Sequence, residues 1–311
     1  MASLPILNVL EKSQVSPPRA TVDTRLLPLT FFDISWLPFS PVHNLFFYEF
    51  PITKTHSVEK CTLDFNDLTR NHPRDCDKFY PLIPILGHAS KVCDYVKIPI
   101  FSFQVTFFPD CGISIGMINH HCLGDASNRF RFLMAWTSIA RSRTDESFLA
   151  KGDFPLYDRV MKYPKLDEIY LNKAKLETLS QEYKPKFIKT RLVPAVPSNY
   201  FDSCLATCGA MAKTSVLVEK DGFVTAAKLL GDCLHKKLND KDGILKDAAA
   251  CTDFGWGKPK KHEAVGIDYE KGISMSTSKE SNEDLEIGIC HSVAEMEAFI
   301  PIFNGGLEEF I

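Results

Sequence analysis

The sequence has no excess of charge of either sign and no long apolar run. Its 311 residues include 36 Lys and Arg against 39 Asp and Glu, which gives a formal net charge of −3. A balance this even creates no overall positive field for nucleic acid or for an anionic membrane. No uninterrupted apolar stretch approaches the roughly 20 residues that span a bilayer. We therefore expect a protein that binds neither nucleic acid nor membrane.

The sequence shows little sign of a targeting segment or of a paired cysteine pattern, and we expect neither. Residues 1–7 contain no Lys or Arg, and Pro5 interrupts their apolar run, so we expect no secretory signal. The ten cysteines are scattered, and Cys204 and Cys208 have no second pair at a metal-binding spacing. This usage favours reduced thiols and a cytoplasmic location.

The remaining composition is that of a globular protein, with 45% hydrophobic and 24% charged residues. The length is sufficient for two domains of ordinary size. Residues 181–196 are interrupted by proline and have the composition of a linker. We therefore predict an N-terminal domain over residues 1–180 and a C-terminal domain over residues 181–311.

Apolar patterns predict strands and helices in both halves. The expected strands cover residues 27–33, 44–50, 98–108, 112–118, a pair within 204–218, and 285–290. The turn residues at 109–112 predict a hairpin between the third and fourth of these strands. The expected helices begin at residue 126, cover 167–179 and 222–238, and follow a capping box at residues 292–295 up to Gly305. This pattern predicts an α/β fold.

The segment Asn-His-His-Cys-Leu-Gly-Asp at residues 119–125 lies between a predicted strand and a predicted helix. Side chains at such a junction are held rigidly and stay reachable. An imidazole titrates near neutrality, so His121 could take a proton from an alcohol and return it to a leaving group. We expect His120, on the opposite side of the strand end, to be structural.

Asp125, four residues after His121, has several possible roles. It could orient the imidazole, cap the following helix, or pair with Arg129 at i, i+4, and spacing slightly favours a structural role. His120, His121 and Asp125 could also bind a metal, but no further cluster of ligands supports this, so we expect none.

A second segment, Asp253-Phe254-Gly255-Trp256-Gly257, shares its first three residues with the magnesium-binding motif of protein kinases. The glycine-rich loop and the other kinase motifs are missing, which argues against phosphoryl transfer. The glycines indicate a tight loop, in which the Trp256 indole N–H either meets an oxyanion or the ring fills the core. The lysines that follow this loop could bind a phosphate or be solvated: Lys258, Lys260 and Lys261.

The two motifs His121-x-x-x-Asp125 and Asp253–Gly257, in this order, resemble the HxxxD and DFGWG motifs of the plant BAHD acyl-CoA-dependent acyltransferases. The resemblance extends to residues 29–33 and 286–288. Residues 200–204, Tyr-Phe-Asp-Ser-Cys, are similar to the Tyr-Phe-Gly-Asn-Cys of the anthocyanin and flavonoid glucoside malonyltransferases within that family.

The resemblance implies two related chloramphenicol-acetyltransferase-like α/β domains with a channel between them, the second domain being shortened here. His121 would be the general base that activates an acceptor hydroxyl for attack on the thioester, and Trp256 would stabilise the oxyanion. Arg129 would bind the malonyl carboxylate through its guanidinium. Four residues would have structural roles in the motifs: Asp125, Asp253, Gly255 and Gly257.

The same resemblance implies the partners of the reaction. Malonyl-CoA or another acyl-CoA would be the co-substrate. The acceptor would be a flavonoid or anthocyanin glucoside or another glycosylated phenolic compound. No cofactor would be bound permanently. We expect a monomer.

The chain also departs from the family pattern. Family members are longer, and the missing blocks fall after His56, near residues 190–197 and near residues 247–251. An arginine that pairs with the HxxxD aspartate in the family comes from the second block and has no counterpart here. An alternative prediction is therefore a catalytically silent, truncated member that binds CoA or a glucoside, and a third, weaker one is hydrolysis of the thioester.

Overall fold

The computed structural model describes residues 7–15, 27–34, 36–37, 39–50, 61–88, 90–93, 95–144, 154–157, 214–217, 252–268, 273–277 and 285–308, and a few single positions between them. It divides the chain into two units. Unit 1 consists of Met1–Ser16, Pro41–His120 and Asp247–Ile311, and unit 2 consists of Pro17–Ser40 and His121–Lys246. The expected boundary at residue 180 lies outside the described residues, so the division into domains 1–180 and 181–311 stays a prediction.

A regular hairpin forms the centre of unit 1. Strand β4 (Phe101–Phe108) pairs antiparallel with β5 (Gly112–Asn119) along their whole lengths. The Cys111 N–H donates to the Phe108 carbonyl at 3.1 Å, which closes the turn. Gly112 has φ 152°, and a Cβ there would lie 1.9 Å from the Tyr48 carbonyl oxygen, so a side chain cannot be accommodated. The hairpin and its turn confirm the sequence prediction.

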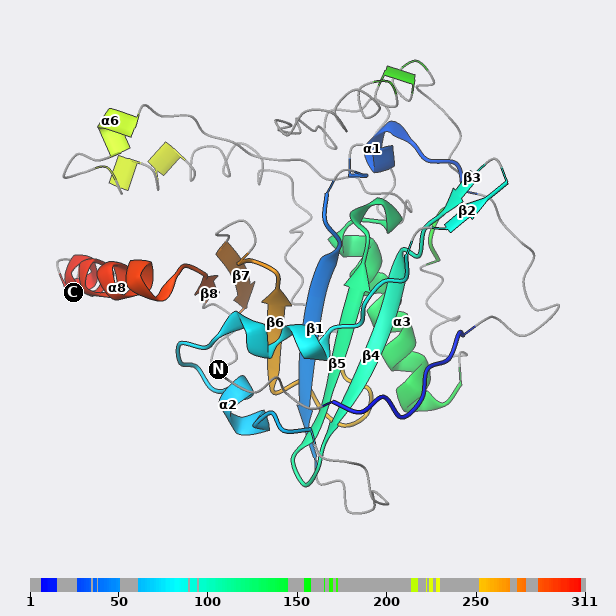
Figure 1. Cartoon of the computed structure of the whole chain (residues 1–311), viewed down its shortest axis with the longest axis horizontal. Coiled ribbons are helices and arrows are strands. Elements are labelled where there is room, and N and C mark those ends of the chain that lie inside the picture. Colours follow the sequence, from blue (N-terminus) through cyan, green and yellow to red (C-terminus); the bar gives the residue numbers. More distant parts are fainter. Residues whose placement is uncertain are drawn as a thin grey trace. The chain divides into compact units, whose positions relative to one another are not determined.

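Two further strands complete a four-stranded antiparallel sheet in the order β4-β5-β1-β6 (Figure 1). Strand β1 (Val42–Glu49) pairs with β5 on one side and with β6 (Lys261–Val265) on the other. Val42 is opposite Asn119, and Glu49 is opposite Gly112. The sheet therefore has one end at residues 42 and 119 and another at residues 49 and 112.

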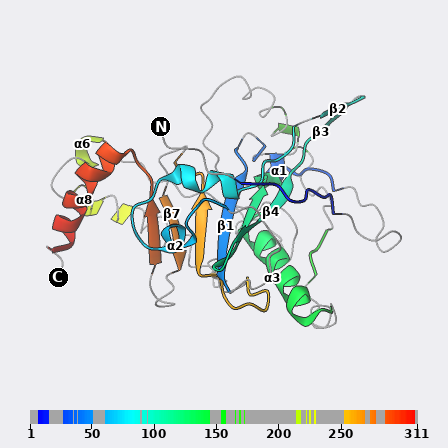
Figure 2. The same cartoon turned by 60° about the horizontal axis from the view of Figure 1, so that its bottom comes forward.

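Short helical segments cover one face of this sheet (Figure 2). They are α2 (Phe65–Thr69), η1 (Cys76–Lys78) and η2 (Tyr80–Leu82). Their apolar residues pack on β1, β4 and β5 in one core cluster: Leu45, Phe47, Phe65, Leu68, Phe79, Leu82, Ile83, Phe108 and Ile118. The approach is close, because a Cβ at Gly116 would lie 2.1 Å from the Leu82 carbonyl oxygen. Glycine at this position lets the covering layer reach the sheet.

Two two-stranded sheets and a helix also belong to unit 1. Strands β2 (Ser90–Val92) and β3 (Tyr95–Lys97) form one pair, and β7 (Ile273–Thr277) and β8 (Leu285–Ile289) form the other. Helix α8 (Val293–Glu308) follows β8. Strands β1 and β8 confirm the predictions over residues 44–50 and 285–290.

The start of α8 was predicted correctly and its end was not. The Ser292 N–H donates to Glu295 Oε2 at 3.0 Å, and the Glu295 N–H donates to Ser292 Oγ at 3.4 Å, as a capping box requires. The helix continues through Gly305 to Glu308. Glycine permits the left-handed conformation that ends a helix but does not impose it, so the expected stop at Gly305 was wrong.

The described part of unit 2 contains the helices α1 (Phe31–Ile34), η3 (His121–Leu123), α3 (Ala126–Ser142) and α6 (Thr214–Leu217). The strand predicted over residues 27–33 is wrong. The Thr30 N–H donates to Asp33 Oδ2 at 3.2 Å, and the Ile34 N–H donates to the Thr30 carbonyl. This capping arrangement closes a helical turn despite the β-forming aromatic residues.

Other predictions for the second half fall partly outside the described residues. Residues 214–217 are helical, which contradicts the part of the strand pair expected up to residue 218. The described positions between 222 and 229 are helical, as expected, whereas the linker at 181–196 and most of the helix at 167–179 lie outside them. In the described ranges, none of the helices combines the length and apolarity needed to cross a membrane.

Candidate functional site

His121 lies at the point where the central strand β5 turns into the helical segment η3. Asn119 ends the strand and is fully buried, and the His120 N–H donates to the Ile100 carbonyl at 2.8 Å. This bond continues the pairing of β4 with β5 by one residue, because Ile100 precedes β4 and His120 follows β5. The strand end is thus fixed up to His120, and His121 is the first residue beyond it, with a partly exposed side chain.

The ring of His121 is stacked on the indole of Trp36. The ring centroids are 4.1 Å apart and the planes are inclined by 21°. Trp36 is only 8% exposed, and its backbone N–H donates to the Asp33 carbonyl at 2.9 Å, directly after α1. Phe39 contacts the indole from the same loop at 4.9 Å. The imidazole plane is therefore set by a buried aromatic ring that the local turn of α1 holds in place.

Asp125 is the N-cap of α3. Its Oδ1 accepts the Asn128 N–H at 3.0 Å and the Asn128 side-chain amide at 3.1 Å. The residue is 3% exposed, and a Cβ at Gly124 would lie 3.0 Å from that of Asn128. Of the roles that the sequence left open for Asp125, the helix cap is the one that these contacts show.

Arg129 lies one turn into α3, and its backbone N–H donates to the Asp125 carbonyl at 3.1 Å. Burial lowers the pKa of its guanidinium below the ordinary value, and the negative charge of Asp125 opposes this shift. Burying a cation costs free energy unless an anion or hydrogen-bond acceptors accompany it. Arg129 therefore provides unit 2 with a positive charge close to the HxxxD motif in a partly desolvated setting, where an anionic group is attracted strongly.

The second motif forms a loop that is organised by its first residue. Asp253 Oδ1 accepts the N–H groups of Gly255 at 2.8 Å and of Gly257 at 3.0 Å. Both glycines have positive φ angles, 97° and 92°, which other residues adopt only with strain. The Asp253-x-Gly255-x-Gly257 pattern therefore encodes the shape of the loop.

Aromatic residues anchor this loop to the end of β1. Phe254 is buried and is stacked with Trp256, with ring centroids 5.5 Å apart. Trp256 also contacts Phe50 at 5.2 Å and Tyr48 at 5.9 Å, and it remains 50% exposed. The Tyr48 hydroxyl donates to the Thr252 carbonyl at 2.7 Å. Burial raises the pKa of Tyr48 well above its ordinary value, which keeps the hydroxyl protonated as a donor.

The register of β1 separates the Trp256 loop from the end of β5. Trp256 packs on residues 48 and 50, whereas Asn119 is opposite Val42. Seven residues of an antiparallel strand span about 23 Å. Within unit 1, Trp256 and Asn119 therefore lie at opposite ends of β1, and the ring contacts of Trp256 favour the packing role that the sequence left open for it.

The lysines after the second motif have protein partners. Lys260 Nζ lies 2.9 Å from Glu49 and also faces the ring of Phe65. Lys261 is buried and donates to Asn71 and Glu286. Two of the three lysines are thus used in ion pairs within unit 1, which argues against a phosphate site formed by the whole cluster.

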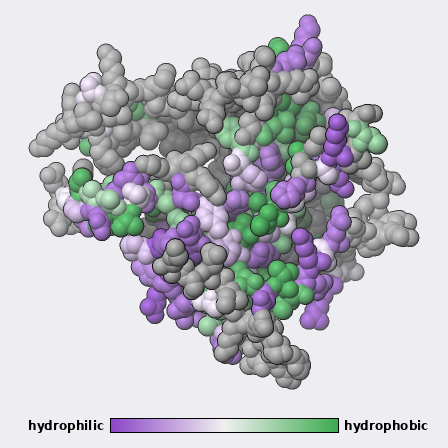
Figure 3. Space-filling view, viewed as in Figure 1, coloured by the Kyte–Doolittle hydropathy of each residue, from purple (hydrophilic) through white to green (hydrophobic). Residues whose placement is uncertain are grey.

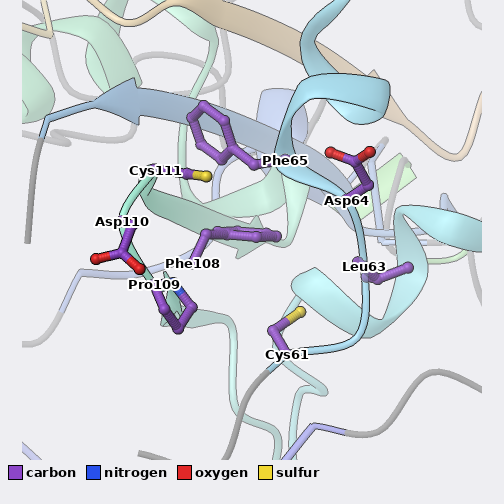
Figure 4. Close-up of a pocket in the computed structure, with 8 residues that line it drawn as sticks. All are labelled: Cys61, Leu63, Asp64, Phe65, Phe108, Pro109, Asp110 and Cys111. Atoms are coloured by element: carbon purple, nitrogen blue, oxygen red, sulfur yellow. The ribbon is translucent and has the colours of Figure 1, made fainter.

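A pocket of about 260 Å³ opens at the hairpin end of the sheet (Figure 4). It lies between the turn of the β4–β5 hairpin and the segment leading into α2, and the rings of Phe65 and Phe108 meet there at 5.2 Å. The eight lining residues are Cys61, Leu63, Asp64, Phe65, Phe108, Pro109, Asp110 and Cys111. The pocket belongs to the end of the sheet that is remote from Asn119.

Trp36 is the residue near His121 that sequence reasoning missed. The two residues are 85 positions apart, so no local pattern connects them. A signal was present in the Thr30-x-x-Asp33 capping pattern, which predicts a helical turn immediately before Trp36. Across the part of the chain that the structure describes, no three His, Cys, Asp or Glu side chains come together as a possible metal site.

Comparison with known proteins gives matches over the whole chain. Residues 57–193 match the Transferase family. The chain is 36% identical to a malonyl-coenzyme A:anthocyanin 3-O-glucoside-6''-O-malonyltransferase of Dahlia pinnata, with 100% of both sequences covered. It is 27% identical to a malonyl-coenzyme:anthocyanin 5-O-glucoside-6'''-O-malonyltransferase of Salvia splendens, with 96% of this chain and 95% of that protein covered.

A solved structure confirms the α/β fold. The crystal structure of vinorine synthase is similar with a TM-score of 0.59 at 14% sequence identity, and the match covers 91% of this chain and 93% of the other. The alignment with the Dahlia protein is 458 positions long, whereas this chain has 311 residues, so at least 147 aligned positions have no residue here. The similarity therefore spans the full length of that relative with large internal gaps.

Proposed function

The chain belongs to the Transferase family of plant BAHD acyl-CoA-dependent acyltransferases, and on this premise we propose that it transfers a malonyl group from malonyl-CoA to a hydroxyl of an anthocyanin or other phenolic glucoside. The observation that carries the proposal is the full-length, 36% identical match to a malonyltransferase with such an acceptor. The His121 motif at the end of β5 supports it, because it supplies the group that the chemistry needs.

In the proposed mechanism, His121 is the general base. Its imidazole removes the proton from the acceptor hydroxyl as the oxygen attacks the thioester carbonyl carbon. The tetrahedral intermediate collapses with cleavage of the carbon–sulfur bond, and the CoA thiolate takes the proton back from the imidazolium. Trp36 acts as a positioning residue, because its stacked indole holds the ring plane and attracts the transient positive charge through its π face.

Arg129 is the proposed recognition site for the free carboxylate of the malonyl group. Its guanidinium is partly buried one turn along α3 from the HxxxD segment. A guanidinium and a carboxylate form paired charge-assisted hydrogen bonds, which strengthen where water is excluded. The donor preference for a dicarboxylic acyl group would then arise from this residue.

The remaining motif residues have proposed structural roles. Asp125 caps α3, and Asp253, Gly255 and Gly257 shape the loop that places Phe254 and Trp256 on β1. The oxyanion donor expected at Trp256 is the less favoured of its two roles, because that ring packs at the opposite end of β1 from Asn119. The channel between two related domains, the monomeric state and the cytoplasmic location stay predictions of the sequence.

The decisive experiment compares acyl donors. The purified full chain is incubated with malonyl-CoA or acetyl-CoA and a panel of anthocyanin and flavonol glucosides, and acylated product and free CoA are measured. We expect malonylated glucoside, and kcat/KM for malonyl-CoA to fall about 10- to 100-fold in Arg129→Ala while acetyl transfer changes little. Arg141→Ala, an exposed arginine of the same helix, is the matched control. Equal losses with both donors would contradict the role of Arg129.

The second candidate function is binding without turnover, and one observation favours it. At least 147 positions of the aligned Dahlia enzyme have no counterpart in this chain. Such gaps remove groups that would contact substrates. Calorimetric binding of CoA or a glucoside with no product from any donor would support this candidate, and sustained product formation would exclude it.

A further inference from the structure

Two cysteines that are far apart in the sequence meet in unit 1. Cys76 begins η1, and Cys290 follows β8 and precedes α8. Their sulfur atoms are 3.2 Å apart, although the residues are separated by 214 positions. Both side chains are partly buried, and both are reduced thiols.

We propose that Cys76 and Cys290 are a redox modification site, at which a reversible disulfide fastens the start of α8 to the η1 segment. A disulfide bond is about 2.05 Å long, so the sulfur atoms need to approach by only about 1.2 Å. The two residues belong to different segments that are already in contact. Closure therefore requires small side-chain movements rather than a rearrangement of the sheet. The proposal does not depend on the acyl-transfer reaction.

The surroundings indicate which sulfur reacts first. Burial, the adjacent Cys290, and the charges of Asp268 and Asp75 raise the pKa of Cys76 to about 12. Cys76 therefore remains a thiol at neutral pH, and a thiol is a poor nucleophile compared with a thiolate. We assign the first attack to Cys290, with Cys76 as the resolving residue.

With hydrogen peroxide as the oxidant, the steps balance. The Cys290 sulfur attacks one peroxide oxygen, the O–O bond breaks, and the departing hydroxide takes up a proton as water, which leaves a sulfenic acid. The Cys76 sulfur then attacks the Cys290 sulfur, the S–O bond breaks, and the hydroxide leaves as water with the Cys76 proton. Two thiols together lose two electrons and two protons, and one peroxide becomes two waters.

The bond would change how the C-terminal segment is held. The hairpin of β7 and β8 lies beside β6, to which Lys261 joins it through Glu286 (Figures 1 and 2). Helix α8 exposes apolar residues (Figure 3), which are Val293, Ile300, Ile302 and Phe303. A cross-link at Cys290 anchors the residues immediately before this helix. In a reducing compartment such a bond is transient and responds to oxidants rather than being permanent.

The test uses the full chain treated with hydrogen peroxide, quenched with iodoacetamide and digested with trypsin. Cleavage after Arg74, Lys78 and Lys279 yields peptides 75–78 and 280–311, each with a single cysteine. We expect these two peptides to be linked and to separate on reduction with dithiothreitol. Hydrogen exchange at the start of α8 should slow in the oxidised protein.

Variants and an internal reference make the result decisive. Cys76→Ser and Cys290→Ser should each remove the linked peptide, whereas Cys93→Ser, at an exposed cysteine, should leave it unchanged. Oxidation of Cys93 in the wild-type chain shows that the peroxide dose was sufficient. If Cys93 is oxidised while Cys76 and Cys290 are both alkylated by iodoacetamide, the proposal is overturned, and this result needs no variant to fold.

Discussion

The two motifs that identify the family use an aspartate in the same way and differ in what surrounds it. Asp125 and Asp253 each accept two N–H groups from residues two to four positions further along the chain. The first motif has a partly exposed imidazole stacked on Trp36. The second has a phenyl and an indole ring packed on the end of β1. One motif therefore provides a group that can transfer a proton, and the other provides a means of fastening a loop to the sheet.

This difference shows that two motifs of equal diagnostic value need not have equal chemical roles. A short pattern identifies a family whenever the fold requires it, whether the requirement comes from catalysis or from packing. Here the backbone geometry of Gly255 and Gly257 explains the second pattern without any reaction. His121, by contrast, carries an imidazole that can transfer a proton. Mutations can separate the two explanations.

The largest effect is expected at His121. His121→Ala removes the proposed base and should lower kcat/KM for malonyl transfer by about 10²- to 10⁴-fold, measured by product formation. Circular dichroism and thermal unfolding should be close to those of the wild type. His120→Gln is the matched control and should cost less than about fivefold, so a similar loss in both variants would contradict the assignment of the base.

The aspartates should show their effects on stability rather than on chemistry. Asp253→Ala leaves two loop N–H groups without their acceptor and should lower the free energy of unfolding by about 2 kcal/mol, and Asp125→Ala should lower it by about 1–2 kcal/mol through loss of the cap. Urea unfolding at constant pH measures both. If Asp125→Ala abolished turnover while stability stayed unchanged, Asp125 would act on His121 directly, and the proposed likeness between the two motifs would fail.

A smaller loss is expected when the ring beneath His121 is removed. Trp36→Leu keeps an apolar side chain but ends the stacking, and we expect kcat to fall about tenfold with little change in KM, since misplacing a catalytic group costs rate rather than binding. Trp36→Phe should recover most of the rate. Equal rates in the Leu and Phe variants would show that the ring contact at 4.1 Å has no positioning role.

The smallest effect is expected at Trp256. Trp256→Phe keeps a ring against Phe50 and Phe254 and removes only the indole N–H. We expect kcat to change less than about twofold, because the ring lies at the far end of β1. Loss of an oxyanion donor typically costs about 10²- to 10³-fold in kcat, so a decrease of that size would reverse our interpretation of the second motif.

Features set by adjacent residues were accessible to sequence reasoning. The Pro109–Gly112 turn, the cap at Asp125 and the capping box at Ser292 all depend on side chains within four positions of one another. Even so, the turn at α1 was mistaken for a strand, because its aromatic residues have high β-propensity and outweighed the Thr30–Asp33 pattern. Local rules therefore succeed where one of them clearly dominates.

Contacts between distant residues were inaccessible for a physical reason. The stacking of Trp36 on His121 and the ion pair of Lys261 with Glu286 depend on the path of the chain. Spacing in the sequence contains no information about such pairs. The same applies to Trp256, for which the residue type allowed either packing or hydrogen bonding, and only the register of β1 with β5 favoured packing.

The pairing of β1 on both sides has a consequence for how the chain folds. Its partner β5 is complete at Asn119, but its partner β6 ends only at Val265. At a synthesis rate of about 5–20 residues per second, β1 has one unpaired edge for roughly 7–30 s. An unpaired edge with apolar residues on both faces is a site for association between chains, so recombinant yield should rise when chaperones that cover this edge during synthesis are abundant.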